Sequence, residues 1–367
     1  MKKQNVTSKV WRVALVVVGT VIGAGFASGA EIMAYFTGYG EAGLWAIGIA
    51  GVLFFAGIYG TLKIAYEYRC TEYGTFTEKI AGKWVGAALD ALVVLSMLLG
   101  YGVMLAGSGA IFLQQWAVPE DWGALLMAGA VMATLRFGSK GLLAVNRIIT
   151  PILIIGILLA SIYGIITKSF VAETIGLSLQ PLSIFTAQPV KNVLPAMWSA
   201  ITYASYNMLG GIAVLVGMSK HIQTEKEGAM VGGCAACILV ALTLALGLAT
   251  FLNYDTIRNI PIPVLRLLDE QEFWSQLYVI VLLGAMYTTA VADAFGLLSR
   301  VASIRRCSEG VKLILLTALA MVLARMGFAR LVEKGYRLLG YFGVVQILLI
   351  VIKCIPKKEN INGKQKR

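Results

Sequence analysis

The sequence predicts an all-α membrane protein that crosses the bilayer many times. Of its 367 residues, 58% are hydrophobic, and the mean hydropathy is +0.79. Charged residues make up only 14%, whereas soluble domains contain about 25%. Long apolar runs separated by polar turns recur along the chain. The net charge of +12 is therefore interpreted relative to the lipid bilayer, and no nucleic-acid partner is expected.

The apolar runs predict ten membrane-spanning helices, because a helix of about 20 apolar residues crosses the hydrocarbon core. The two shortest runs are the fourth and the ninth. The predicted spans cover residues 10–36, 42–66, 85–116, 121–136, 140–167, 190–218, 228–253, 273–303, 312–326 and 332–353.

The positive residues predict the orientation of these spans. With the N-terminus in the cytoplasm, most of the 31 lysine and arginine residues lie in cytoplasmic segments, as the positive-inside rule requires. We therefore expect both termini in the cytoplasm, with the basic tail 354–367 beside anionic lipid. One segment departs from the rule, because Arg325, Arg330, Lys334 and Arg337 would face outward.

The ten spans divide into two halves of five, residues 10–167 and 190–353, within a single transmembrane domain 1–367. Because five is odd, the two halves have opposite orientations in the membrane. The sequence therefore predicts an inverted repeat, an arrangement typical of transporters.

The first span of each half contains small and polar residues near its middle. These stretches are GTVIGAGFASGAEI, residues 19–32, and SAITYASYNMLGG, residues 199–211. We expect both helices to be broken there, because a break buried in protein exposes amides that attract anions and carbonyls that attract cations. The alternative for the first stretch is plain helix packing through its small residues.

No enzyme is expected, because no span carries a nucleophile–base pair, a histidine cluster or a phosphate-binding loop in a plausible context. GAGFASG is one residue away from a dinucleotide-binding fingerprint. It has no strand before it and lies within a span, which excludes that interpretation.

The pattern of spans and breaks resembles the amino acid–polyamine–organocation superfamily, which has the LeuT-type fold. More narrowly, GAGFASGAEI and YASYN resemble the YkvI-like bacterial membrane proteins. The resemblance covers essentially the whole chain. It implies alternating access in a bacterial plasma membrane, with a small-molecule substrate held at mid-membrane between spans 1, 3, 6 and 8.

The resemblance also implies a sodium site, with Na⁺ as coupling ion and no other cofactor. In GAMYTTAVADAFG of span 8, Ala285, Thr288 and Thr289 have the family spacing, and the matching carbonyls in span 1 are those of Gly19 and Ile22. Five oxygens suit a hard cation. The alternative is that the two hydroxyls bond to their own helix.

By the same alignment, the amides near Ala24 and Gly25 would meet a substrate carboxylate. Tyr101 of span 3 would close the site, with simple packing as the alternative. The predicted substrate-binding residues are Ala24, Gly25, Ser28, Glu31, Tyr101, Tyr203, Ser205, Tyr206 and Asn207.

Three carboxylates lie in the interior of predicted spans, away from their first and last residues: Glu31, Asp90 and Asp293. A charged carboxylate in the hydrocarbon, as at Glu31, costs roughly 2.5–3.5 kcal/mol on insertion scales. Glu31 or Asp293 would carry a proton or pair with a substrate amine. Asp90 would reach the interface or pair with a basic residue, and Arg300 is a possible structural partner of Asp293.

Together these features predict a sodium-coupled symporter of a small amino acid or related amine. Two rivals stay open. One is proton coupling through Glu31 or Asp293, and the other is a ligand-sensing membrane protein of the same fold without net transport.

Overall fold

The computed structural model describes residues 6–136, 151–167, 192–269, 271–301 and 308–355, and every regular element among them is a helix. The predicted linker between the halves (168–189), the start of the fifth span and nearly all of the basic tail lie outside the described residues. The division into two halves therefore stays a prediction.

The first span consists of three helical pieces, and most later spans are single helices. In chain order the labelled α-helices are α1 (Val6–Val21), α2 (Ala24–Ala27), α3 (Ala30–Tyr35), α4 (Glu41–Glu67), α5 (Tyr73–Trp116), α6 (Glu120–Arg136), α8 (Val193–Met218), α9 (Glu225–Leu252), α10 (Tyr254–Ile257), α11 (Pro263–Leu267), α12 (Glu272–Arg300), α13 (Glu309–Ala324), α14 (Phe328–Arg330) and α15 (Tyr336–Cys354). A further apolar helix covers Pro151–Thr167, and a π-helical turn, Leu331–Gly335, precedes α15.

Six helical stretches in the described part of the chain are long and apolar enough to cross a membrane. They are Glu41–Glu67, Tyr73–Trp116, Val193–His221, Glu225–Leu252, Glu272–Arg300 and Phe328–Cys354. Many large apolar side chains on these helices are exposed, Trp45, Phe273 and Ile280 among them. Exposed apolar surface of this extent is expected where helices face lipid. The chain is therefore a helical membrane protein.

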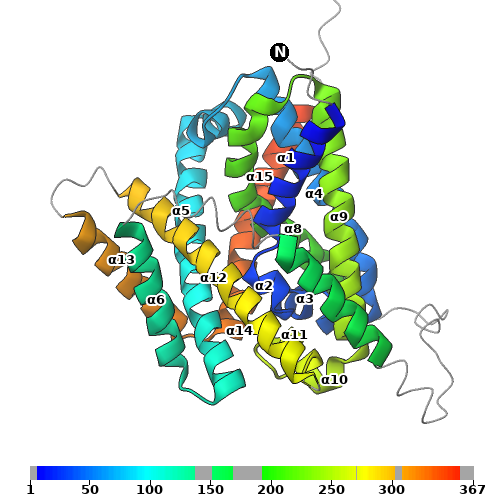
Figure 1. Ribbon diagram of the computed structural model, residues 1–367. Helices are drawn as coiled ribbons and strands as arrows, with labels where there is room; N and C mark the ends of the chain where they lie inside the picture. The colour runs from blue at the N-terminus through cyan, green and yellow to red at the C-terminus, as the bar shows by residue number, and fades with distance from the viewer. Residues whose placement is uncertain (1–5, 137–150, 168–191, 270, 302–307, 356–367) are drawn as a thin grey trace, which may run out of the picture.

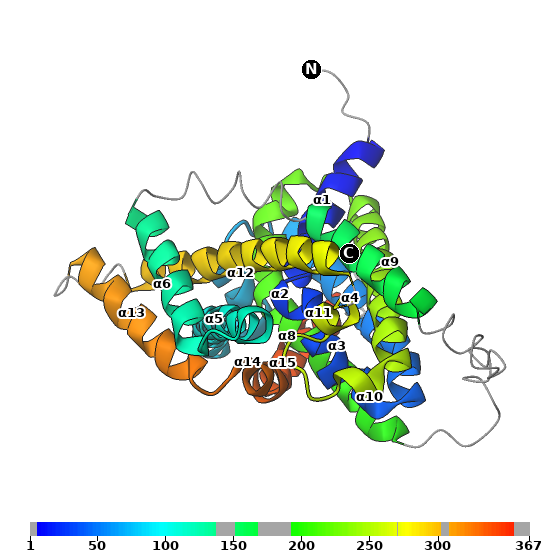
Figure 2. The same ribbon diagram turned by 60° about the horizontal axis from the view of Figure 1, so that its bottom comes forward.

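The helices form two groups that meet along α5 and α15 (Figures 1 and 2). In one group α4 packs against α8 and α9, and α1 packs against α9 and α8. In the other, α5 packs against α6, α12 and α13. Helix α15 contacts α8, α4 and α5, and so joins the groups. The broken first span lies between α9 and α12, in the middle of the molecule (Figure 1).

The expected break in span 6 is wrong for this structure, because α8 is one continuous helix from Val193 to Met218. Two of its polar side chains hydrogen-bond to carbonyls of the helix itself. The Thr202 hydroxyl donates to the carbonyl oxygens of Trp198 and Ser199, and Asn207 Nδ2 donates to Tyr203 O at 3.0 Å. Such back-bonding lets polar side chains lie in a helix without unwinding it.

Two of the segments that connect the long helices are themselves helical. The Tyr73 end of α5 forms a short helical piece, set off from the long span by Gly82 at φ 78°. The segment after α9 holds α10 and α11, the second of which begins at Pro263. Proline is favoured in the first turn of a helix because no amide hydrogen bond is lost there.

Candidate functional site

The first interruption of span 1 lies between α1 and α2. The Gly23 amide donates to Val21 O at 2.9 Å instead of continuing the α-helical pattern. Among the described residues, the carbonyls of Gly19 and Ile22 receive no backbone hydrogen bond, and the amides of Ala24 and Gly25 donate none. The break therefore leaves both carbonyl and amide groups free, as the sequence predicts for this stretch. Ile22 and Ala24 are 2% and 0% exposed, so the break is shielded from lipid, which such groups require.

The second interruption lies between α2 and α3 and is held by Ser28. Its hydroxyl donates to Gly25 O at 2.8 Å and accepts from the Ala30 amide at 3.2 Å. Gly29 follows with φ at 82°, a left-handed conformation that glycine adopts without strain. Ser28 was predicted to bind substrate. In the structure its hydroxyl stabilises the turn from which α3 begins.

Helix α11 covers this second interruption from outside the bundle. The Val264 amide donates to Ser28 O at 3.0 Å. A side chain on Gly29 would lie 3.1 Å from Val264 Cγ2. Gln114 of α5 anchors the segment, because its amide group donates to Ile262 O and accepts from the Ile262 amide, both at 3.2 Å. These contacts of Val264 and Gln114 make α11 a lid over the second interruption.

Glu31 lies in the first turn of α3 and is 3% exposed. Its side chain folds back onto α2, where a β-carbon on Gly25 would lie only 2.2 Å from Glu31 Oε1. Tyr206 lies within interaction distance of the carboxyl group. The other oxygen, Oε2, is buried and has no hydrogen-bond partner in the part of the chain that the structure describes. The Gly25 face that was predicted to receive a substrate carboxylate is therefore occupied by the protein's own carboxyl group.

Aromatic side chains from three helices gather beside Glu31, and we call Tyr35, Tyr203, Tyr206 and Tyr336 the tyrosine cluster. Tyr206 stacks on Tyr35 and Tyr336, with ring centroids 5.7 Å and 4.8 Å away. Tyr203 lies 5.3 Å from Tyr35 and 5.7 Å from Tyr206. Among the described residues, the buried hydroxyl of Tyr35 has no hydrogen-bond partner. Three α8 and α3 residues predicted for substrate binding, Glu31, Tyr203 and Tyr206, thus meet here.

Other predicted substrate residues face elsewhere. Tyr101 is fully buried, and its hydroxyl lies 3.1 Å from Thr317 Oγ1 of α13. It packs against that helix instead of closing the tyrosine cluster, in agreement with the packing alternative. Ser205 faces α15, where a β-carbon on Gly343 would lie 3.2 Å from Ser205 Cβ. Asn207 bonds to its own helix.

The other two carboxylates in predicted spans, Asp90 and Asp293, have different surroundings. Arg300 Nη1 donates to both oxygens of Asp90 at 2.6 Å, so Arg300 is the partner of Asp90 and not of Asp293. Asp293 instead lies against α5, where a β-carbon on Gly100 would be 2.3 Å from Asp293 Oδ2.

Arg337 also lies in this region, although its place near Glu31 was not predicted from the sequence. Its position near the start of the last span placed it among the outward-facing basic residues. In the structure its Nη2 donates to Ala34 O of α3 at 3.0 Å, and the guanidinium lies 5.6 Å from the centre of the Tyr35 ring. A π-helical turn lies directly before Tyr336, and such turns are frequent at functional sites.

Comparison with known proteins relates the whole chain to bacterial membrane proteins. The chain is 25% identical to the membrane protein YkvI of Bacillus subtilis, over 95% of this chain and 97% of that one. It is 28% identical to YyaD of the same organism, over 94% and 96% of the two chains. No family model matches the sequence.

Comparison with solved structures identifies the fold. The transporter MhsT in complex with L-phenylalanine superposes with a TM-score of 0.66 at 16% identity, covering 92% of this chain and 87% of that one. A Na⁺-coupled sialic acid symporter gives a TM-score of 0.58 at 16% identity, covering 93% and 78%. The chain has the LeuT-type fold. These neighbours are transporters and not enzymes.

Within this LeuT-type fold, the predicted sodium ligands lie on the break and on α12. Helix α12 packs against α2, and the Tyr278 hydroxyl donates to Ala27 O at 2.6 Å. Thr288 is buried, and its hydroxyl donates to Ala285 O at 3.0 Å. A hydroxyl that donates in this way keeps its lone pairs, so both the sodium and the helix-bonding interpretations remain compatible with the geometry. Thr289 is half-buried.

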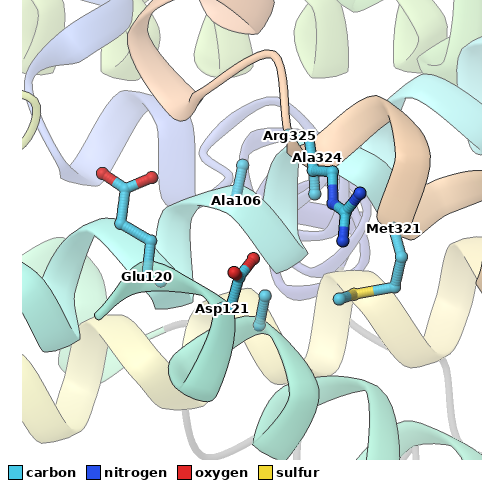
Figure 3. Close-up of a pocket in the computed structure, with 8 residues that line it drawn as sticks. Ala106, Glu120, Asp121, Met321, Ala324 and Arg325 are labelled. Atoms are coloured by element: carbon cyan, nitrogen blue, oxygen red, sulfur yellow. The ribbon is translucent and has the colours of Figure 1, made fainter. Parts of the chain in front are cut away.

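A small cavity of about 30 Å³ lies away from the tyrosine cluster, where the ends of α6 and α13 meet α5 (Figure 3). Asp121 and Arg325 line it from opposite helices and are exposed. Its volume holds a water molecule or two. This cavity is therefore too small for an organic substrate.

Proposed function

We propose that the chain is a secondary transporter whose substrate carries an ammonium group, bound by Glu31 and the tyrosine cluster. The observation that carries the proposal is the buried Glu31 carboxyl group, which keeps one oxygen without a partner among stacked tyrosines at the break of span 1. The transporter class is supported by the fold shared with MhsT and the sialic acid symporter.

The chemistry of this site favours a cation. A carboxylate in a dry site needs a compensating partner, and an ammonium group supplies both charge and hydrogen-bond donors. Tyrosine ring faces attract cations, with energies of about 2 kcal/mol or more when the groups are desolvated. A site that combines a carboxylate with tyrosine ring faces therefore favours an amine, or the amino group of an amino acid, over a neutral or purely anionic solute.

The proposal includes ten membrane spans, with both termini in the cytoplasm of a bacterial cell. Besides the six long helices, the remaining spans would be α1 to α3 together, α6, the helix Pro151–Thr167 and α13. Each of these four is short or interrupted, so helix length and composition alone do not identify it as a membrane span. The distribution of lysine and arginine supports the orientation.

We further propose that Na⁺ is the coupling ion, held by carbonyls of Gly19 and Ile22 and by Ala285, Thr288 and Thr289. The free carbonyls at the break support this assignment. Proton coupling is the second candidate. It is favoured by Asp293, which has no ion pair among the described residues and lies against Gly100 of α5.

Uptake into proteoliposomes tests the transporter proposal. The reconstituted chain should accumulate a labelled amino acid or amine from a mixed panel when Na⁺ is higher outside at equal pH. Accumulation driven only by a pH gradient would transfer the coupling role to protons. Specific binding without accumulation under either gradient would contradict transport and favour a ligand sensor.

A further inference from the structure

Arg337 brings a positive charge into the region of Glu31, and no carboxylate of the described residues forms an ion pair with it. Its Nη2 donates to the Ala34 carbonyl, its guanidinium lies over the Tyr35 ring, and its Nε is buried with no hydrogen-bond partner in the described part of the chain. Burying part of a guanidinium beside a neutral carbonyl alone is costly. The arrangement indicates that a further acceptor completes the site.

Arg337 and Glu31 both lie near Tyr35 but form no ion pair with each other. Both act electrostatically on the Tyr35 hydroxyl, and Glu31 and Tyr35 are four residues apart on one face of α3. None of the five ion pairs among the described residues includes Glu31 or Arg337. Each keeps one buried polar atom free, Glu31 Oε2 and Arg337 Nε.

Two free, opposite charges beside one aromatic cluster fit a ligand that carries both charges. We propose that Arg337 binds the carboxylate of a zwitterionic substrate whose ammonium group is bound by Glu31 and the tyrosine cluster. The inference rests on the proposed function and narrows its substrate class from amines in general to amino acids. Arg337 is then the residue that determines this specificity.

The break itself supports this assignment. A substrate carboxylate at the Gly25 amide would meet the Glu31 carboxyl group, which lies against Gly25, and two carboxylates at that distance repel each other. The guanidinium on α15 is a planar fork that suits a carboxylate. It reaches α3 from α15, since Arg337 Nη2 donates to Ala34 O and α15 lies next to α3 (Figure 2).

Binding of matched ligand pairs tests the assignment on the purified full chain. Each pair is an amino acid and its decarboxylated amine, for example phenylalanine with phenethylamine and leucine with isoamylamine, measured by titration calorimetry. The unmodified chain should bind at least one amino acid tenfold or more tightly than its amine. In Arg337→Gln this ratio should fall to near one, while the Kd of the amine changes by less than about threefold.

Control variants separate this role from a structural one. Arg330→Gln, at an exposed arginine near the same end of the molecule, should keep the original ratio. Arg337→Lys retains the positive charge without the planar guanidinium and should give an intermediate ratio of amino acid to amine affinity. This variant serves as the test if Arg337→Gln does not fold. Equal weakening of both ligands in the Arg337 variants, or an unmodified chain that prefers the amine, would overturn the inference.

The same measurements distinguish the inference from the proposed function. If Glu31→Gln abolishes binding of both ligands while Arg337→Gln leaves their ratio unchanged, the proposed function stands and the inference fails. If no member of any pair binds the unmodified chain, both fail.

Discussion

Gly25 and Glu31 act as one unit at the break of span 1. The missing side chain of Gly25 makes the space that the Glu31 carboxyl group fills. Asp293 uses Gly100 of the facing helix in the same way. In each case a glycine is required for close approach of a carboxyl group, and not for an unusual backbone angle.

The contact between Gly25 and Glu31 predicts that substitutions of two neighbouring glycines affect ligand binding differently. We expect Gly25→Ala to displace Glu31 and to weaken ligand binding by tenfold or more, because the new methyl group would overlap the carboxyl oxygen. Gly23→Ala is the matched control, since nothing lies within 4 Å of its β-carbon position and its φ is −90°. Calorimetric Kd values for both variants check this. Equal effects would contradict the paired role of Gly25 and Glu31.

The predicted sodium ligands allow a second test at single residues. We expect Thr288→Ala to raise the Na⁺ concentration needed for half-maximal uptake by tenfold or more, because a hydroxyl ligand is lost. Thr317→Ala, at a buried hydroxyl that contacts Tyr101 of α5, is the control and should leave this concentration unchanged. An unchanged Na⁺ dependence in Thr288→Ala would support the interpretation that its hydroxyl serves only its own helix.

At the scale of helices, the lid α11 is fixed by Gln114. Two hydrogen bonds join Gln114 to Ile262, and each contributes about 0.5–1.5 kcal/mol. We expect Gln114→Leu to loosen the lid and to speed ligand dissociation about fivefold or more. Stopped-flow measurement of the dissociation rate checks this.

Gln115→Leu is the control for the lid, because Gln115 is also half-buried on α5 but has no hydrogen bond to the lid among the described residues. Its dissociation rate should match that of the unmodified chain. If both variants release ligand equally fast, the lid assignment is wrong.

The two predicted breaks show what sequence patterns can establish about helices. Span 1 combines clustered glycines with Ser28, whose hydroxyl holds the turn, and the chain is interrupted there. In span 6, Thr202 and Asn207 hydrogen-bond to carbonyls of their own helix, which stays continuous. Composition alone does not separate these outcomes, because the same polar side chains suit a break or a bonded helix.

Arg337 shows a different limit of the sequence. Charge counting places a residue on one side of the membrane but gives no direction for its side chain. The π-helical turn before Tyr336 leaves no pattern in the sequence that we could identify. Glu31, by contrast, was recognisable as a functional candidate because a carboxylate in an apolar span is costly.

For the whole molecule, an ion pair at the end of α1 links the broken span to α9. Lys9 Nζ lies 2.7 Å from Glu227 Oε2, with side chains 16% and 8% exposed. The Gln223 amide also donates to Glu227 at 2.8 Å. Breaking a pair this sheltered leaves a charge without its partner, which is strongly destabilising.

We therefore expect Lys9→Met to lower the Tm of the purified chain by several degrees. Lys63→Met is the control, because Lys63 pairs with Glu225, whose side chain is 51% exposed, and exposed pairs contribute about 1 kcal/mol or less. Equal shifts in the two variants would show that Lys9 does not hold α1 against α9.

The central claim is that Glu31 binds the ammonium group of a transported substrate. Calorimetric titration of the unmodified chain and of Glu31→Gln with the same ligand tests it most directly, with Glu333→Gln, an exposed glutamate in the π-helical turn, as control. We predict that Glu31→Gln weakens binding by a factor of ten or more and that Glu333→Gln does not. Unchanged affinity in Glu31→Gln would contradict the account.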